Sequence, residues 1–263
     1  MNTPCLELHD VTYAVNGRNV LYRASWAVAR GEHWAILGPN GAGKSTLLRI
    51  ICGDLWPNAG GEVVRNGEPV VNLGDLRRSI GWVTSTLAGS IPAREPVLDT
   101  VVSGKFAQLG FWEFVWQPPT TDDVGRARHF LEELGCEALG GRQFGTLSQG
   151  EQQKVLICRA RMADPYLIML DEPCAGMDPG ARETFLASLE ALGRSDTAPS
   201  LIYVTHHVEE ILPIFTRVLV LRDGRVLSMG PAEELLTPGT IGDLYGIAVT
   251  IEKRNGRYWA IPR

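Results

Sequence analysis

The chain has 263 residues and a formal net charge of −5, with 44% hydrophobic and 21% charged residues. These values are typical of a globular protein, and the length suits one large domain or a domain with an inserted subdomain. The acidic balance argues against general nucleic-acid binding. No sequence stretch is apolar for long enough to span a membrane, and Pro4, Glu7 and Asp10 interrupt a signal-peptide pattern. The five scattered cysteines are expected to be free thiols in a reducing compartment.

The first third of the chain is predicted to form strands, with one helix after a glycine-rich loop. Alternating and apolar patterns predict strands at 6–11, 25–29, 34–37 and 62–64, and Asn16-Gly17 is typical of a hairpin turn. The loop separates the strand at 34–37 from a helix at 45–52. A strand followed at once by a glycine-rich loop and a helix indicates a phosphate site.

The middle and last thirds predict an inserted helical region followed by a return to strands and helices. A strand at 80–83 precedes helical periodicity over 97–163, with helices at 123–134 and 149–162. Further strands are expected at 167–170 and 201–204, and helices at 182–192 and 207–212. Asp223-Gly224 and Asn255-Gly256 predict two late hairpins, at 217–229 and 247–261. This order favours a mainly parallel α/β sheet flanked by an antiparallel lobe.

The glycine-rich loop matches the P-loop pattern, in which backbone N–H groups form a nest for phosphates. The following helix adds its positive N-terminal end. Lys44 is placed to reach the outer phosphates, and the Ser45 hydroxyl to bind Mg²⁺. The expected nucleotide-binding residues of the loop are Gly38, Pro39, Asn40, Gly41, Ala42, Gly43, Lys44, Ser45 and Thr46.

An apolar strand ending in two acids is the expected companion of the P-loop. Residues 167–170 lead into Asp171 and Glu172, at the carboxyl end of a strand, where ligands bind in open α/β sheets. Asp171 is predicted to hold Mg²⁺, directly or through water. Glu172 is predicted to orient and polarise the attacking water.

Three further stretches resemble the motifs of the ATP-binding-cassette (ABC) family. Leu147-Ser148-Gln149-Gly150-Glu151 resembles its signature motif, and physically it is a helix N-terminus capped by Ser148. Ala175-Gly176-Met177-Asp178 resembles the loop whose acid contacts the opposite subunit. Val204-Thr205-His206 resembles the switch-histidine motif, and the neighbouring His207 is an alternative that the sequence leaves open.

The resemblance covers nearly the whole chain and implies an α/β P-loop NTPase fold with a RecA-like parallel core. It implies a nucleotide-binding core with the antiparallel β lobe at 1–84 and 164–263, and a helical signature subdomain at 85–163. It also implies ATP hydrolysis with Mg²⁺, in which Glu172, His206 and Lys44 are the catalytic residues. Two copies, or this chain and a homologous ABC domain, would sandwich two ATP molecules, and Ser148, Gln149, Gly150 and Asp178 would serve the partner's nucleotide.

Three positions depart from the family pattern, and one of them, Cys174 where Thr or Ser is common, is explained as a small buried side chain. Transport ATPases usually carry a glutamine after the strand at 80–83, and the aligned residue here is Ser85. Family members also stack an aromatic residue on adenine, and counting back from Lys44 gives Val15, with Tyr13 as the possible substitute. We therefore expect weak base selectivity if neither residue stacks on the base.

Two functions remain open from the sequence. The first is the cytoplasmic motor of a transporter, with a transmembrane subunit as partner. The second is a soluble ATP switch in repair or translation, which Ser85 favours slightly. The aromatic-rich segment 106–116 fits either a grip on a membrane subunit or core packing. The stretches around Ser148, Asp171 and His206 also resemble stand-alone ATPases of the molybdate-transport or photorepair type.

Overall fold

The computed structural model describes residues 4–69, 72–106 and 118–263. These residues cluster into two compact units. The first unit contains the chain up to Leu73 together with Ser200–Arg263, and the second contains Gly74–Pro199. The helical subdomain predicted at 85–163 lies within the second unit, and its boundaries stay a prediction.

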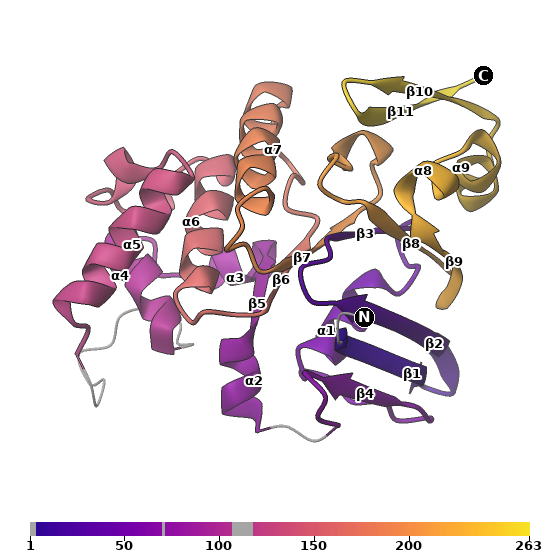
Figure 1. Ribbon diagram of the computed structural model, residues 1–263, viewed down its shortest axis with the longest axis horizontal. Coiled ribbons are helices and arrows are strands. Elements are labelled where there is room, and N and C mark those ends of the chain that lie inside the picture. The colour runs from indigo at the N-terminus through magenta and orange to yellow at the C-terminus, as the bar shows by residue number, and fades with distance from the viewer. Residues whose placement is uncertain (1–3, 70–71, 107–117) are drawn as a thin grey trace. The chain divides into compact units, whose positions relative to one another are not determined.

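An antiparallel sheet of three strands opens the first unit (Figure 1). Its order is β2-β1-β4, with β1 in the centre. Asn16 and Gly17 join the first two strands with φ angles of 50° and 75°, which confirms the predicted hairpin turn. The strands are β1 (Pro4–Val15), β2 (Arg18–Ala29) and β4 (Glu62–Arg65).

The parallel strands of the first unit lie in the order β7-β3-β8, with β9 added antiparallel at the edge. Every residue of β3 and β7 is buried. Continuous burial, in place of alternation, is what parallel strands covered on both faces require. The strands are β3 (Trp34–Leu37), β7 (Ser200–Thr205), β8 (Arg217–Arg222) and β9 (Arg225–Pro231).

The helices of the first unit are short, and a C-terminal hairpin follows the last of them (Figure 1). Asn255 and Gly256 form the hairpin turn with φ angles of 50° and 77°, as the sequence predicts. These elements are α1 (Lys44–Ile51), α8 (Ala232–Leu235), α9 (Pro238–Tyr245), β10 (Val249–Arg254) and β11 (Arg257–Pro262).

The helix predicted at 207–212 is wrong. The segment forms only a 3₁₀ turn, η4 (Val208–Glu210), after which Ile211 is extended with ψ of 102°. Pro213 explains the early end, because proline disfavours the α-helical conformation in the residue before it and removes a backbone donor. The chain after β7 is therefore a tight loop.

The second unit is built around the helix α6, which packs against α4, α5 and α7 (Figure 1). Four consecutive residues, Val155–Cys158, are buried in α6, so the helix is apolar around its whole circumference where it crosses the core. Two parallel strands, β5 and β6, complete the unit. The helices are α2 (Leu73–Ser79), α3 (Ser85–Ser90), α4 (Val97–Ser103), α5 (Thr121–Glu133), α6 (Gln149–Arg161) and α7 (Pro179–Gly193). The strands are β5 (Ile80–Thr84) and β6 (Leu167–Asp171), and three 3₁₀ turns are η1 (Gly104–Phe106), η2 (Glu137–Leu139) and η3 (Phe144–Thr146).

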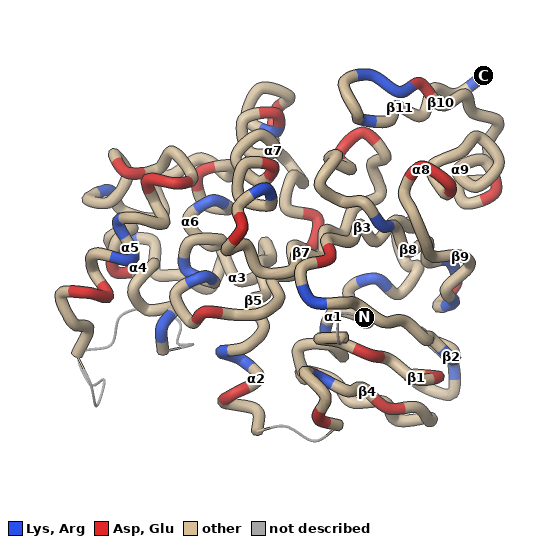
Figure 2. Tube along the Cα trace, viewed as in Figure 1, with Lys and Arg blue, Asp and Glu red and all other residues tan. Residues whose placement is uncertain are grey.

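Charged residues of both signs are interspersed along the elements of each unit (Figure 2). Among the described residues, no helix has the length and apolarity needed to cross a bilayer. Phe111, Trp112, Phe114 and Trp116, the core of the aromatic-rich segment, lie outside the described residues.

Candidate functional site

The P-loop follows β3, and its shape depends on glycines. Gly41 and Gly43 have φ angles of 80° and 99°, a region that other residues rarely adopt. A Cβ on Gly43 would lie 2.8 Å from the Val20 carbonyl oxygen, and one on Gly38 would lie 2.2 Å from the Leu221 carbonyl oxygen. Because backbone fills the space on that side, only glycine permits this curl, which is the form of an anion nest.

Lys44 begins α1 and folds back over the loop. Its Nζ donates to the carbonyl oxygens of Gly38 at 2.8 Å and Pro39 at 3.1 Å. The side chain is only 5% exposed, whereas Ser45 is exposed. Since the first turn of α1 contains no acidic residue, the positive end of the helix is not neutralised from within the helix.

His206 lies beside the P-loop because of the strand register. Leu37 at the end of β3 pairs in parallel with Thr205 at the end of β7, so Gly38 and His206 leave the same edge of the sheet from neighbouring strands. This edge is where open α/β sheets bind ligands. The centroids of the His206 and His207 imidazole rings lie 4.2 Å apart, with the ring planes tilted by 39°. The structure therefore brings the predicted phosphate loop and the predicted switch histidine together.

The two candidates for the adenine contact both lie in β1. The Val15 side chain is 46% exposed, whereas Tyr13 is partly buried. Between them, Asn58 holds Ala14 by two hydrogen bonds of 2.8 Å, one to its N–H and one from its own amide to the carbonyl oxygen. The position aligned with the family's aromatic residue thus presents a valine to solvent, and the base contact stays a prediction.

Asp171 ends β6 in the second unit, and Glu172 follows it. Thr84 of β5 pairs with Asp171, so Ser85 and Glu172 follow neighbouring parallel strands. Glu172 has a φ of 47°, a left-handed conformation that costs a residue with a Cβ roughly 1–2 kcal/mol. Such strain persists only where the surrounding structure fixes it, and it is enriched at functional sites.

Ser85, at the position of the usual glutamine, is the first residue of α3. The Thr84 hydroxyl caps this helix by accepting a 2.9 Å hydrogen bond from the Leu87 N–H. The segment after β5 is therefore a capped helical turn with a short hydroxyl side chain. A serine at this point lacks the reach of a glutamine.

The signature segment forms the N-terminus of α6, as predicted. Ser148 is the N-cap, and the Glu151 carboxylate accepts from the Ser148 N–H at 2.7 Å and from its hydroxyl at 2.9 Å. Partial burial favours a raised Glu151 pKa, but the hydrogen bonds from Ser148 and the charge of Arg142 outweigh it and lower the pKa below its usual value. A Cβ on Gly150 would make only ordinary contacts, at 3.7 Å from the Met177 sulfur.

The loop at 175–178 packs beside the signature segment within the second unit. The Gln149 side chain covers Gly176, so that a Cβ on this glycine would lie 2.8 Å from its Oε1. Asp178 is the N-cap of α7, and its Oδ1 accepts from the N–H groups of Gly180 at 2.9 Å and Ala181 at 3.0 Å. Asp178 and the signature residues therefore share one surface region, each at the start of a helix.

Sequence reasoning missed the groups that support the His206 loop. Glu210 accepts from the Thr205 hydroxyl, Tyr245 donates to the His206 carbonyl oxygen and Arg257 donates to the Glu209 carbonyl oxygen. None of the three is assigned a role from the sequence. Glu210 lies in the stretch around His206 that resembles the family. Its nearness to that motif was therefore the only sequence signal of a role. Tyr245 and Arg257 act on backbone carbonyl groups, which leave no residue-type pattern in a sequence.

Comparisons with known proteins agree with these features. The ABC transporter family matches residues 21–175. An uncharacterized ABC transporter ATP-binding protein of Bacillus subtilis, YlmA, is 39% identical over 88% of this chain and 87% of its own length. The ADP conformation of an ATP-binding cassette of an ABC transporter matches with a TM-score of 0.78 and 25% identity, over 93% of this chain and 99% of that one. A dimeric post-hydrolysis cassette bound to ADP and Pi matches with a TM-score of 0.70 and 26% identity, over 86% and 98%.

The family match covers more than half of the chain, and the resemblance to YlmA covers most of both proteins. The fold, with its P-loop between β3 and α1 and its parallel strands, is that of an ABC cassette. The chain therefore belongs to the ABC transporter family and is an ATP-binding protein that hydrolyses ATP.

Proposed function

We propose that this chain drives transport as the ATPase subunit of an ABC transporter, at the cytoplasmic face of a membrane and through a transmembrane partner. The observation that carries this proposal is the register of β3 and β7, which pairs Leu37 with Thr205 and so sets the P-loop beside His206. A phosphate-binding nest next to a histidine suits recognition of a terminal phosphate. The family's transport role supports the rest.

The site residues would contact the phosphates, the attacking water and the adenine. The P-loop amides and Lys44 bind phosphate oxygens, and His206 contacts the γ-phosphate. Glu172 orients and polarises the attacking water, with its carboxylate accepting the hydrogen bond from water. Tyr13 or Val15 meets the adenine. These roles rest on the motifs and on the local geometry of each unit.

Mg²⁺ fits the donors that the chain offers. Ser45 and Asp171 supply a hydroxyl and a carboxylate, which are the hard oxygen ligands that Mg²⁺ prefers. Phosphate oxygens and water would complete the coordination. The bound ion would neutralise charge on the phosphates during phosphoryl transfer.

The active form is a twofold dimer of this chain, or a pair with a homologous cassette. Ser148, Gln149 and Gly150 begin a helix whose N-terminal end attracts an anion, and Asp178 lies in the neighbouring loop. We assign this surface to the partner's ATP. Because ATP then bridges two copies, its binding favours the dimer and its hydrolysis releases it.

Two variants test the assignment. Glu172→Gln should retain ATP binding and accumulate an ATP-dependent dimer in gel filtration, because water is no longer activated while the interface is intact. Lys44→Ala should lose ATP affinity in a fluorescent-nucleotide titration. A Glu172→Gln protein that stays monomeric in saturating ATP, or a Lys44→Ala protein with wild-type affinity, contradicts the assignment.

A soluble switch in repair or translation is the second candidate, and Ser85 is the observation that favours it. Its short side chain opens α3, where transport ATPases usually present a glutamine. Copurification decides between the two functions. The transporter subunit should sediment with membranes only when its transmembrane partner is present, and a switch should stay in the supernatant.

A further inference from the structure

The loop that carries His206 is fixed from inside by one buried acid. Glu210 is 4% exposed, and its Oε2 accepts hydrogen bonds from the Thr205 hydroxyl at 2.6 Å and the Tyr203 hydroxyl at 3.0 Å. The Thr205 hydroxyl oxygen also accepts from the His207 N–H at 3.0 Å. These bonds join the end of β7 to η4, so residues 205–210 form a closed loop.

Two side chains from the C-terminal segment hold the same loop from outside. The Tyr245 hydroxyl donates to the His206 carbonyl oxygen at 2.8 Å. The Arg257 guanidinium donates to the Glu209 carbonyl oxygen, from Nε at 2.9 Å and from Nη2 at 2.5 Å. Since a peptide plane turns as a unit, holding a carbonyl oxygen also fixes the backbone next to it. One of the two carbonyl groups belongs to His206 itself.

Both donors are anchored independently of the loop. Tyr245 ends α9, and Arg222 of β8 donates to the Asp243 carbonyl oxygen at 2.5 Å, which ties this helix end to the sheet. Arg257 begins β11, directly after the hairpin turn. A Cβ on Gly256 in that turn would lie 3.0 Å from Pro213, so the turn packs against Pro213, which follows the loop in the chain.

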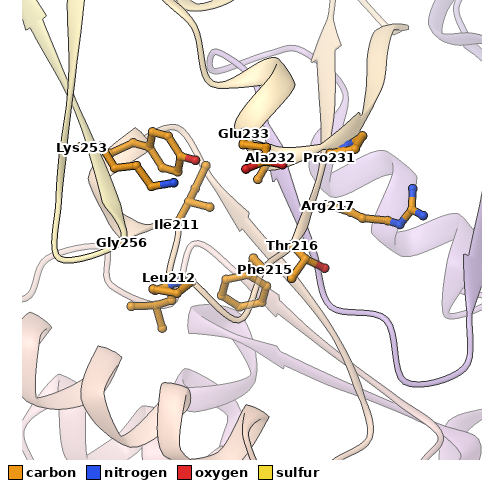
Figure 3. Close-up of a pocket in the computed structure, with 12 residues that line it drawn as sticks. Ile211, Leu212, Phe215, Thr216, Arg217, Pro231, Ala232, Glu233, Lys253 and Gly256 are labelled. Carbon is orange, nitrogen blue, oxygen red and sulfur yellow. The ribbon is translucent and has the colours of Figure 1, made fainter.

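The hairpin meets the rest of the unit across a pocket of about 490 Å³, which Ile211, Phe215 and Lys253 help to line (Figure 3). In Figure 3, Lys253 lies on the hairpin side, across the space from Thr216 and Glu233. Beside this space, β11 packs against η4, and the hydrogen bonds of Arg257 to the Glu209 carbonyl oxygen belong to that contact.

We infer that Tyr245 and Arg257 are positioning residues for ATP hydrolysis, acting through the backbone of the His206 loop. The inference rests on the proposed function, in which the His206 imidazole contacts the γ-phosphate. A histidine at a strand end reaches a phosphate only while its backbone keeps one orientation, and a misplacement of about 1 Å is enough to slow catalysis strongly. The C-terminal segment, which contains no family motif, thereby supports the reaction.

Tyr245→Phe removes one hydroxyl and is the main test. The expected result is a fall in kcat of about fivefold, which corresponds to about 1 kcal/mol and to one ordinary hydrogen bond. The KM for ATP should change less than twofold, because the phosphates are bound chiefly by the P-loop. Tyr258→Phe is the matched control: its hydroxyl lies in the same segment and interacts with Lys253, and its loss should leave kcat unchanged.

A charge-retaining pair tests the second donor. Arg257→Met should lower kcat at least tenfold, since a charged donor is lost, and Arg257→Lys should recover part of the rate. Equal rates in these two variants, or a Tyr245→Phe protein with wild-type kcat, overturn the inference. A rise in KM with unchanged kcat also overturns it, because that result would indicate a role in nucleotide binding.

A double-mutant cycle separates this inference from the proposed role of His206. His206→Ala alone should reduce hydrolysis, and wild-type hydrolysis in that variant refutes the proposed role itself. In the His206→Ala background, Tyr245→Phe should add no further loss in single-turnover measurements. A repeated fivefold loss there shows that Tyr245 acts elsewhere and overturns the inference while the His206 role stands.

Hydrogen exchange provides a readout that needs no hydrolysis. Tyr245→Phe should increase exchange at the amides of residues 206–210 relative to Tyr258→Phe, because the loop loses one of its attachments. The rest of β7 should keep its protection. Unchanged exchange in the loop contradicts the inference even if the His206→Ala rate falls below detection.

Discussion

Arg65 should contribute more to the stability of the first unit than any exposed charge of α1. Its side chain is 1% exposed, and its guanidinium donates to the carbonyl oxygens of Ile51 at 2.8 Å and Ile50 at 2.5 Å. These two residues end α1, the helix that begins at the P-loop. A buried positive charge therefore meets the negative end of the helix whose positive end lies at the P-loop.

The size of the effect follows from these two hydrogen bonds. A bond from a charged donor contributes roughly 1.5–3 kcal/mol, and removing a buried partner also leaves the acceptor poorly solvated. Arg65→Met should therefore lower the free energy of unfolding by about 3 kcal/mol. Arg65→Lys keeps the charge, but a single ammonium cannot reproduce the forked geometry of the guanidinium, so about half of that loss is expected.

Urea denaturation followed by circular dichroism measures these differences, and an unchanged slope would show that only stability has changed. Arg49→Met is the matched control, because Arg49 is an exposed basic residue of the last turn of α1 and should matter by less than about 0.5 kcal/mol. Hydrogen exchange should locate the Arg65→Met loss in α1. The reasoning is refuted if the free energy of unfolding of Arg65→Met changes by less than about 0.5 kcal/mol, or if Arg65→Met and Arg49→Met lose equal amounts.

Three other predictions concern different parts of the chain. The Lys105 ammonium, 2.7 Å from the buried Asp123 carboxylate, and the hydrogen bonds from Thr120 outweigh burial and lower the Asp123 pKa to about 2. The Asp123 carboxylate should contribute about 2 kcal/mol to the free energy of unfolding. This contribution should be full above pH 4 and lost toward pH 2. An Asp123→Asn protein with the same acid unfolding curve as the wild type contradicts this. Gly150→Ala should fold normally, because the new Cβ makes only ordinary contacts, yet should weaken the ATP-dependent dimer of Glu172→Gln at least tenfold in gel filtration; a full dimer would exclude this helix start from the interface. Val15 exposes an aliphatic side chain, so hydrolysis of GTP should match that of ATP within about tenfold, and Val15→Trp should raise ATP affinity by about fivefold or more through stacking.

The sequence predicted local structure best where one residue type has a specific backbone role. Asn16-Gly17 and Asn255-Gly256 were identified as hairpin turns, and both pairs have positive φ angles because these residues adopt the left-handed region at little cost. Ser148 was likewise recognised as a helix cap. The helix at 207–212 failed because a side-chain network around Glu210 and the proline at 213 override a weak local preference.

The site was predictable to the extent that its chemistry depends on side chains within a motif. The P-loop glycines were identified from their spacing, and the structure supplies the reason: at Gly38 the backbone of Leu221 leaves no room for a side chain. The neighbourhood of Gly38 and His206 could be inferred only through the family resemblance, because the pairing of β3 with β7 joins segments far apart in the chain. The contacts of Tyr245 and Arg257 were beyond prediction, since their acceptors are carbonyl groups that every residue has.

Helix α1 and the His206 loop are held by the same kind of contact, an arginine that donates to backbone carbonyl groups. Arg65 binds the carbonyl groups that end α1, and Arg257 binds the carbonyl group of Glu209 in the His206 loop. In both cases the donor comes from a strand outside the motif that it supports. Motif residues also hold their own backbone, as Lys44 does for Gly38 and Pro39, but residues elsewhere in the unit add contacts that no motif contains. Substitutions at such supporting positions should therefore alter the rate or stability of this ATPase while every motif residue stays in place.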